Sequence, residues 1–205
     1  MRIFVISMIE LLYISEQLPL IKSKVSGSRK NAFQMESGGI EWIPVVEPSG
    51  LVTGRTEREN AHASGLLHPV VHMQIINRRG EIFLQKRSAS KLVCPDMWDS
   101  AVGGHVLLGE IFEEALYREA RQELEFTLFN PYRLATYIYE SQSDRELVAL
   151  YGAVGNFSLN PHNEEVEKGE WWTVQQIEEN LGRGVFTPNF IYEWQNYKDN
   201  ILAML

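Results

Sequence analysis

The chain of 205 residues contains one cysteine, Cys94, so no disulfide can form within a single copy. Disulfides are common in oxidising compartments, and a chain without them is typical of a reducing compartment, here taken to be the cytoplasm. Nothing in the sequence around Cys94 marks its thiol as activated. We therefore interpret this cysteine as an ordinary loop residue and not as a nucleophile.

Positive charge is also scarce in this chain. It has 19 lysine and arginine residues against 27 aspartate and glutamate residues, which gives a net charge of −8. Proteins that bind nucleic acid usually carry a basic patch, so the composition argues against a nucleic-acid partner. It is compatible with a small phosphorylated substrate, because a bound divalent cation reverses the local sign of the charge.

Long hydrophobic runs are absent. The apolar stretch of residues 3–14 is interrupted by Glu10 and is too short to span a membrane. No small-residue cleavage site of a signal peptide follows this stretch. The sequence therefore predicts neither a membrane anchor nor a membrane partner.

The first part of the chain differs in composition from the rest. Residues 22–39 are polar and rich in serine, glycine and lysine, which is typical of a linker. We expect residues 1–40 to be an N-terminal extension that is disordered or non-native, with Met35 as the natural start. Residues 41–205 are expected to form one folded domain.

From residue 41 onwards, strand patterns alternate with helix patterns. A turn at residues 48–50 lies between two β-rich segments and predicts a hairpin. Further strands are predicted at residues 68–76, 81–85, 98–102, 132–140, 147–157 and 170–173. Helices are predicted at residues 55–62, 111–125, 174–181 and 187–202. This order of elements predicts an α/β fold with a mixed sheet.

The segment of residues 104–126 contains the side chains best suited to chemistry. It is rich in good helix formers, and Glu119 and Glu123 lie four residues apart on one face of the predicted helix. Carboxylates that point to one place suit a hard cation such as Mg²⁺ or Mn²⁺, which prefers oxygen ligands. Two glycines, Gly103 and Gly104, end the preceding strand and let the backbone approach a ligand closely.

The spacing G-x5-E-x7-R-E-x3-E, which starts at Gly104 and ends at Glu123, resembles the Nudix box. This box is the metal-binding signature of enzymes that cleave diphosphate linkages. Residues 85–88 and 97–105, which precede it, also resemble the pattern of that family. The resemblance covers about residues 41–202 and implies a Nudix-type α/β/α sandwich.

The resemblance also implies an activity, that of a Mg²⁺- or Mn²⁺-dependent pyrophosphohydrolase acting on a small-molecule diphosphate. A homodimer is common in the family. The metal ligands are expected to be Glu119, Glu123 and Glu110, and Arg118 is expected to orient a box glutamate through an ion pair. These four residues form the expected catalytic set. The expected substrate contacts are Gly103, Gly104, His105 and Arg87.

Two positions depart from the family pattern. Gln122 replaces a glutamate and removes one anionic ligand, so we expect weaker metal binding. Glu114, Glu146 or the acidic run at residues 164–167 could compensate, and Glu165 or Glu167 is a candidate extra ligand or base. Glu125 replaces a glycine that normally ends the helix, which predicts a different exit or a helix that runs on.

Residues 41–68 resemble the branch of the family that is related to isopentenyl diphosphate isomerases. Those enzymes bind a metal through several histidines and use a cysteine and a glutamate in proton transfer. The residues that fall near their histidines and acidic positions are His62, His68, His105, Asp144 and Glu146. The first two histidines are one residue closer together than in that branch. The cysteine position is Gly103, and without a thiol that acid–base pair cannot operate.

Three functions are therefore considered, and the pyrophosphohydrolase ranks first. The second is an isomerase-like enzyme acting on an isoprenoid diphosphate, which needs an acid to replace the missing thiol. The third is a binding module that has lost catalysis, an interpretation that Gln122 favours. The other two histidines receive plain interpretations, His72 as a packed or hydrogen-bonded strand residue and His162 as a solvated turn residue.

Overall fold

The computed structural model describes residues 40–141, 144–159, 161 and 163–205. Apart from residue 40, the extension predicted for residues 1–40 lies outside this part of the chain, and so does His162. Among the residues that are described, no helix is both long enough and apolar enough to cross a membrane.

A mixed sheet of seven strands forms the centre of the domain. Its strands are β3 (His68–Ile76), β4 (Ile82–Arg87), β5 (Trp98–Asp99), β6 (Val102–His105), β7 (Tyr132–Glu140), β8 (Arg145–Val154) and β9 (Val166–Trp172). Their order is β5-β4-β3-β8-β7, with β6 also paired to β3 and β9 also paired to β4. Only β3 and β8 run parallel, and the other pairs are antiparallel. The predicted mixed sheet is confirmed.

Strand β3 is the central strand, and all nine of its residues are buried. One edge of β3 pairs with β8 along its whole length. The other edge is shared, because Val70–Met73 pairs with β6 whereas Ile75–Ile76 pairs with β4. The glycine-containing strand β6 thus lies against the first half of the central strand.

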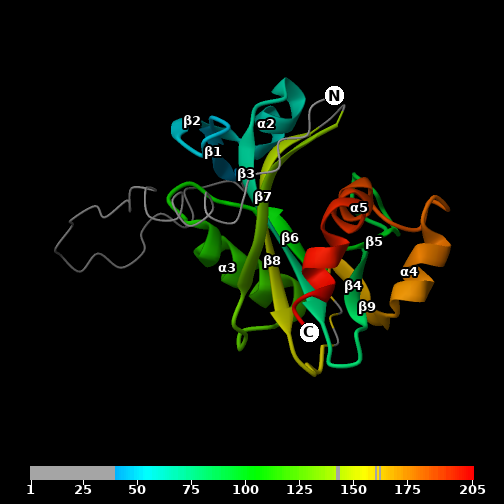
Figure 1. Cartoon of the computed structure of the whole chain (residues 1–205). Helices are drawn as coiled ribbons and strands as arrows, with labels where there is room; N and C mark the ends of the chain where they lie inside the picture. The colour runs from blue at the N-terminus through cyan, green and yellow to red at the C-terminus, as the bar shows by residue number, and fades with distance from the viewer. Residues whose placement is uncertain (1–39, 142–143, 160, 162) are drawn as a thin grey trace, which may run out of the picture. The chain divides into compact units, whose positions relative to one another are not determined.

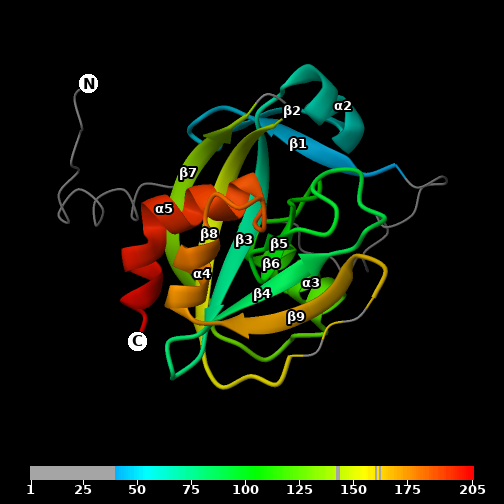
Figure 2. The ribbon, with the colours of Figure 1, turned by 90° about the vertical axis from the view of Figure 1, so that its right-hand side faces the viewer.

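Helices cover both faces of the sheet, as Figures 1 and 2 show. Helix α3 (Phe112–Leu124) packs on one face, and helices α4 (Val174–Asn180) and α5 (Pro188–Leu202) lie on the other. The two cores follow the alternation of side chains along β3, since Val71 packs towards α3 and Ile76 packs towards α5. The predicted α/β/α sandwich is confirmed.

The domain begins with a hairpin and a short helix beside the sheet. Strands β1 (Trp42–Val46) and β2 (Val52–Glu57) pair as predicted, and helix α2 (Arg58–Ser64) follows. The helix predicted at residues 55–62 was wrong at its start. Residues 55–57 remain in β2 because they pair with β1, so the helix begins three residues later.

The strand predicted at residues 147–157 is observed at Arg145–Val154 in β8. Two other segments differ because of the strands with which they pair. The strand predicted at residues 98–102 is two strands, since β5 pairs with β4 and β6 pairs with β3. Strand β9 begins at Val166, four residues earlier than predicted, because it follows β4 from Arg87 to Ile82. Both differences come from pairing with strands distant in sequence, which local patterns do not report.

Candidate active site

The two box glutamates lie against the glycine-containing strand. The backbone N–H of Gly103 donates a hydrogen bond to Oε2 of Glu123 at 3.1 Å. A Cβ atom at Gly104 would lie 2.1 Å from the carboxyl carbon of Glu119. The absence of side chains at these glycines therefore lets β6 approach both carboxylates of α3.

Both carboxylates are shielded from solvent, and burial raises their pKa values. Burial, together with the charge of Glu119, raises the pKa of Glu123 to about 8. Burial also raises the pKa of Glu119, although the guanidinium of Arg118 opposes this effect. The charge of Glu165 raises both pKa values further, which brings this predicted extra acid to the same centre. A divalent cation would stabilise such a cluster in its ionised form.

Arg118 connects the parts of the box. Its guanidinium donates to both carboxylate oxygens of Glu110 at 2.7 and 2.8 Å and to Glu119 at 2.6 Å. It also donates to the backbone carbonyl of His105 at 2.8 Å, which ties helix α3 to the end of β6. The ion pair expected between Arg118 and a box glutamate is therefore present. Both oxygens of Glu110 are engaged, so in this conformation Glu110 holds Arg118.

The sequence departs from the family pattern at Gln122 and Glu125, and the structure shows what each of these residues does. Gln122 is exposed beside the box, and its Oε1 accepts a hydrogen bond from Arg118 at 3.2 Å. The different helix exit predicted from Glu125 is wrong. Glu125 adopts the left-handed conformation that a glycine normally takes, with φ 52° and ψ 26°, and α3 ends at Leu124. Its backbone N–H bonds to the last turn of the helix, which closes the helix in the ordinary way.

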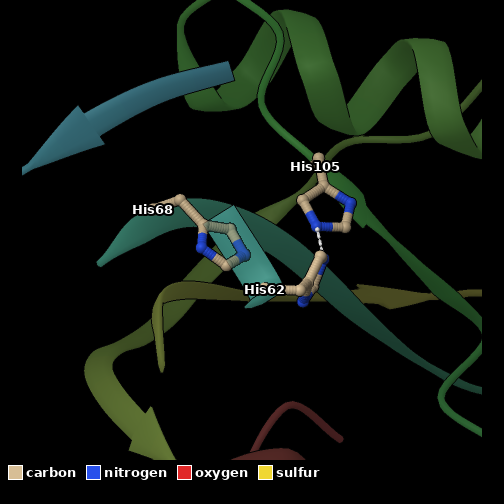
Figure 3. A group of neighbouring side chains, drawn as sticks. All are labelled: His62, His68 and His105. Carbon is tan, nitrogen blue, oxygen red and sulfur yellow. Dashed lines mark hydrogen bonds between the residues drawn. The ribbon is translucent and has the colours of Figure 1, made fainter. Parts of the chain in front are cut away.

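A second centre lies where α2, β3 and β6 meet. His62, His68 and His105 point towards one another there, as Figure 3 shows. Their candidate ligand nitrogens lie within 4.8 Å of one another. Nε2 of His62 is 3.0 Å from Nε2 of His105, and Nδ1 of His62 is 2.6 Å from Oδ1 of Asp144.

The lowered pKa values of His68 and His105 fit a transition-metal site. Burial lowers the pKa of His68, and burial together with neighbouring positive charge lowers the pKa of His105 well below its usual value. Neutral imidazoles are the form that binds metals. Nδ1 of His68 bonds to the carbonyl of Leu66 at 2.8 Å, whereas its buried Nε2 has no hydrogen-bond partner among the residues that the structure describes. That nitrogen is free to bind a metal in the cluster.

Glu146 adds a buried carboxylate to this centre. It stands beside His68 in the register of β3 and β8, and Asn189 donates to it at 3.0 Å. Burial raises the pKa of Glu146, and the nearby charge of His72 opposes this effect more than that of His62 does. The sequence positions that resemble isomerase ligands are thus brought together by the fold.

Arg87 contacts the loop that follows β4. It donates to Asp99 at 3.3 Å and to the carbonyl of Val93 at 3.2 Å, so its hydrogen bonds hold the loop of residues 88–97 against β5. Cys94 lies in this loop, and burial raises the pKa of its thiol. A raised thiol pKa agrees with the interpretation of Cys94 as an unactivated residue.

His72 is a buried, hydrogen-bonded strand residue, as predicted. Its partner could not be predicted, because Nδ1 of His72 lies 2.5 Å from Oε1 of Glu193, which is 121 positions away on α5. Glu193 is fully buried, and no spacing in the sequence connects the two residues.

Comparison with known proteins identifies the family. Residues 66–194 match the family model of the NUDIX domain. The chain is 32% identical over 155 residues to an uncharacterised Nudix hydrolase of Streptomyces coelicolor, with 75% of this chain and 86% of that protein covered. An uncharacterised Nudix hydrolase of Listeria innocua is 32% identical over 152 residues, with coverages of 73% and 89%. The chain belongs to the Nudix family and is a hydrolase acting on phosphoric anhydrides.

Two further relatives refine this placement. An isopentenyl-diphosphate Δ-isomerase of Shigella boydii is 28% identical over 144 residues, with 67% of this chain and 79% of that protein covered. The crystal structure of DR0079 from Deinococcus radiodurans matches with a TM-score of 0.67 at 23% identity, and covers 77% of this chain and 99% of that one. The Nudix fold and the relation to the isomerases, both predicted from sequence, are confirmed.

Proposed function

We propose that this protein is a divalent-cation-dependent pyrophosphohydrolase. It would open a P–O–P linkage in a nucleotide or another diphosphate derivative by attack of water. The observation that supports this function is the approach of two carboxylates, the buried Glu123 and the partly buried Glu119, to the glycine backbone at Gly103 and Gly104. A diphosphate laid along this backbone would meet both carboxylates.

Each residue of the box has a role in this proposal. Glu119 and Glu123 would hold Mg²⁺ or Mn²⁺, which neutralises diphosphate charge and lowers the pKa of a water molecule. Arg118 positions Glu119, and Glu110 positions Arg118 and remains a candidate ligand. Glu165 is the candidate extra acid, since its charge acts on both Glu119 and Glu123. Pairing with lysine does not separate the two candidates, because Glu165 pairs with Lys91 and Glu167 with Lys86, each at 2.8 Å. The proposed substrate contacts are Gly103, Gly104, His105 and Arg87. We also propose that the protein is a homodimer located in the cytoplasm.

The proposal is tested by phosphate release from nucleoside diphosphate derivatives, dinucleotides and isopentenyl diphosphate, with Mg²⁺ or Mn²⁺. We expect wild-type protein to hydrolyse at least one of these compounds, and Glu123→Gln to abolish this turnover. Glu179→Gln is the matched control, because Glu179 is exposed on α4, outside the site. Gln122→Glu restores the family's ligand and should raise turnover. If only Gln122→Glu turns over these compounds, the natural site is catalytically weakened and the proposed activity on them is wrong.

The histidine centre supports a second candidate, an isomerase-like proton-transfer enzyme on an isoprenoid diphosphate. His62, His68 and His105 assemble with two acidic residues, as that branch requires. The missing element is the thiol, since its position is Gly103. A Cβ atom there would lie 3.3 Å from Cδ2 of His72, so a small side chain fits only tightly. Gain of isopentenyl diphosphate isomerisation by Gly103→Cys, without gain by Gly54→Cys, would support this candidate.

A further inference from the structure

The interior of the domain contains a carboxylate that neither metal centre uses. Glu193 of α5 is fully buried, and its two oxygens accept four hydrogen bonds. The donors are Nδ1 of His72 at 2.5 Å, the hydroxyl of Tyr137 at 2.7 Å, Nε2 of Gln74 at 2.6 Å and the hydroxyl of Ser100 at 3.0 Å. Burying a charge is costly unless it is paired and fully hydrogen-bonded, and this one is both.

The network fixes how the imidazole of His72 is turned. Nδ1 carries the proton that is donated to Glu193, so Nε2 lies on the opposite side of the ring. No described residue forms a hydrogen bond with Nε2, although the side chain is only 11% exposed. A carboxylate that accepts a hydrogen bond from one ring nitrogen fixes the orientation of the imidazole and leaves the other nitrogen to contact a ligand.

The open nitrogen faces the glycine strand of the active site. His72 stands opposite Gly103 in the pairing of β3 with β6. A Cβ atom at Gly103 would lie 3.5 Å from Nε2 of His72, so that nitrogen lies against the side of Gly103 that carries no side chain. The backbone N–H of the same Gly103 bonds to Glu123, and His105 follows two residues later on the same side of β6. Nε2 therefore lies beside Gly103 on the face of β6 that also carries His105, and the box is linked to this place through the bond between Glu123 and the Gly103 backbone.

We propose that His72 is a substrate-contacting cation, whose Nε2–H donates a hydrogen bond to a phosphate oxygen of a diphosphate at Gly103. Glu193 is its positioning residue. This inference rests on the proposed function in one respect, because it takes the ligand to be a diphosphate. A charge-assisted hydrogen bond of this kind is among the stronger polar contacts.

The charges around His72 support a fixed cation more than a proton donor. Burial lowers the pKa of His72, but the charge and hydrogen bond of Glu193 outweigh it and raise the pKa to about 9. Glu146 on β8 and Asp99 on β5 add to this effect, and His105 on β6 is the neighbouring basic group. A group that keeps its proton at neutral pH serves better to hold an anion than to release a proton.

The test uses the full chain and methylenediphosphonate with Mg²⁺, a diphosphate that cannot be hydrolysed at its bridge. In nitrogen NMR of the histidine rings, we expect the Nε2 resonance of wild-type His72 to shift when the probe saturates the protein. His72→Gln should raise the dissociation constant about tenfold or more, whereas Lys198→Gln, which removes an exposed cation of α5, should not change it. Glu193→Gln should lower the pKa of His72 in the same spectra.

The outcomes separate this inference from the proposed hydrolysis. A probe that does not bind, or that saturates the protein without moving the His72 resonances, overturns the inference even if a substrate is hydrolysed. An unchanged dissociation constant in folded His72→Gln also overturns it. If no diphosphate is hydrolysed but the probe still shifts His72, the inference stands and hydrolysis fails. The wild-type spectra decide the question even where Glu193→Gln does not fold.

Discussion

The carboxyl carbon of Glu119 lies 2.1 Å from the position that a Cβ atom at Gly104 would occupy. Glu119 is held there by Arg118, and Arg118 is held in turn by Glu110 and by the carbonyl of His105. The box glutamate therefore occupies the space of the side chain that Gly104 lacks. A methyl group at residue 104 would collide with the Glu119 carboxylate, so the substitution of Gly104 by alanine tests this arrangement.

We predict that Gly104→Ala lowers kcat/KM for the hydrolysed substrate about 100-fold, because the methyl group displaces Glu119 by roughly an ångström. Gly54→Ala is the matched control, since a Cβ atom at Gly54 would meet nothing within 4 Å. Circular dichroism should show both variants folded. Equal activity losses in the two variants, or full activity in Gly104→Ala, would contradict the geometry.

A second prediction concerns pH and the stability of the cation-free protein. The pKa of Glu123 rises from about 4.5 to about 8 on folding. Between these pH values the folded state binds more protons than the unfolded state, so the free energy of unfolding falls as pH rises. The loss should be on the order of a few kcal/mol, and Glu119 contributes in the same direction.

Urea unfolding in EDTA at pH 5, 7 and 9 measures this dependence. Glu123→Gln should lose most of the decline, because a glutamine has no proton to release, whereas Glu179→Gln should behave as wild type. Mn²⁺ should bind more tightly at pH 8 than at pH 6, since the metal competes with a proton on Glu123. An unfolding free energy in Glu123→Gln that declines as steeply as in wild type would contradict the assignment.

Local sequence patterns were sufficient for much of the fold and for one of the two centres. Strand β3 was predicted at its observed bounds, because its β-rich segment ends at the turn of residues 77–80. The spacing of Glu119 and Glu123 predicted their shared face, since helical geometry relates residues four apart. These successes depend on rules that act within one element.

The failures involve contacts between distant elements or a conformation that violates a local preference. Pairing with β1 keeps residues 55–57 in a strand, and pairing with β4 lengthens β9 to Val166. The hydrogen bond between His72 and Glu193 joins β3 to α5. These residues are 121 positions apart in the sequence, so no local spacing predicts their contact. Whether the three histidines meet likewise depended on the fold, although resemblance to the isomerases had pointed to them.

A third prediction addresses the histidine centre. Asp144 accepts from Nδ1 of His62 at 2.6 Å and turns the opposite nitrogen towards His105. Losing such a carboxylate typically weakens metal binding about 10–100-fold. We expect this loss for Co²⁺ or Mn²⁺ in Asp144→Asn, measured by calorimetry.

The measurement is made in Glu123→Gln protein, so that the box contributes little to the signal. Asp199→Asn is the matched control, because Asp199 is exposed on α5. If this background binds no metal before Asp144 is changed, the histidine centre is not a metal site. If Asp144→Asn binds as tightly as Asp199→Asn, Asp144 does not orient His62.

The last prediction concerns the end of the box helix. Glu125 is one of three residues other than glycine with positive φ in the described part of the chain, together with Cys94 and Asp96. The left-handed conformation costs a residue with a side chain about 1–2 kcal/mol, whereas glycine adopts it freely but loses more conformational entropy on folding. Glu125→Gly should therefore raise the free energy of unfolding by about 0.5–1 kcal/mol. Urea unfolding measures this, and Glu125→Ala, which keeps Cβ and removes the charge, should give no such gain. Equal stabilisation by alanine would mean that the charge of Glu125, and not its backbone conformation, weakens this helix end.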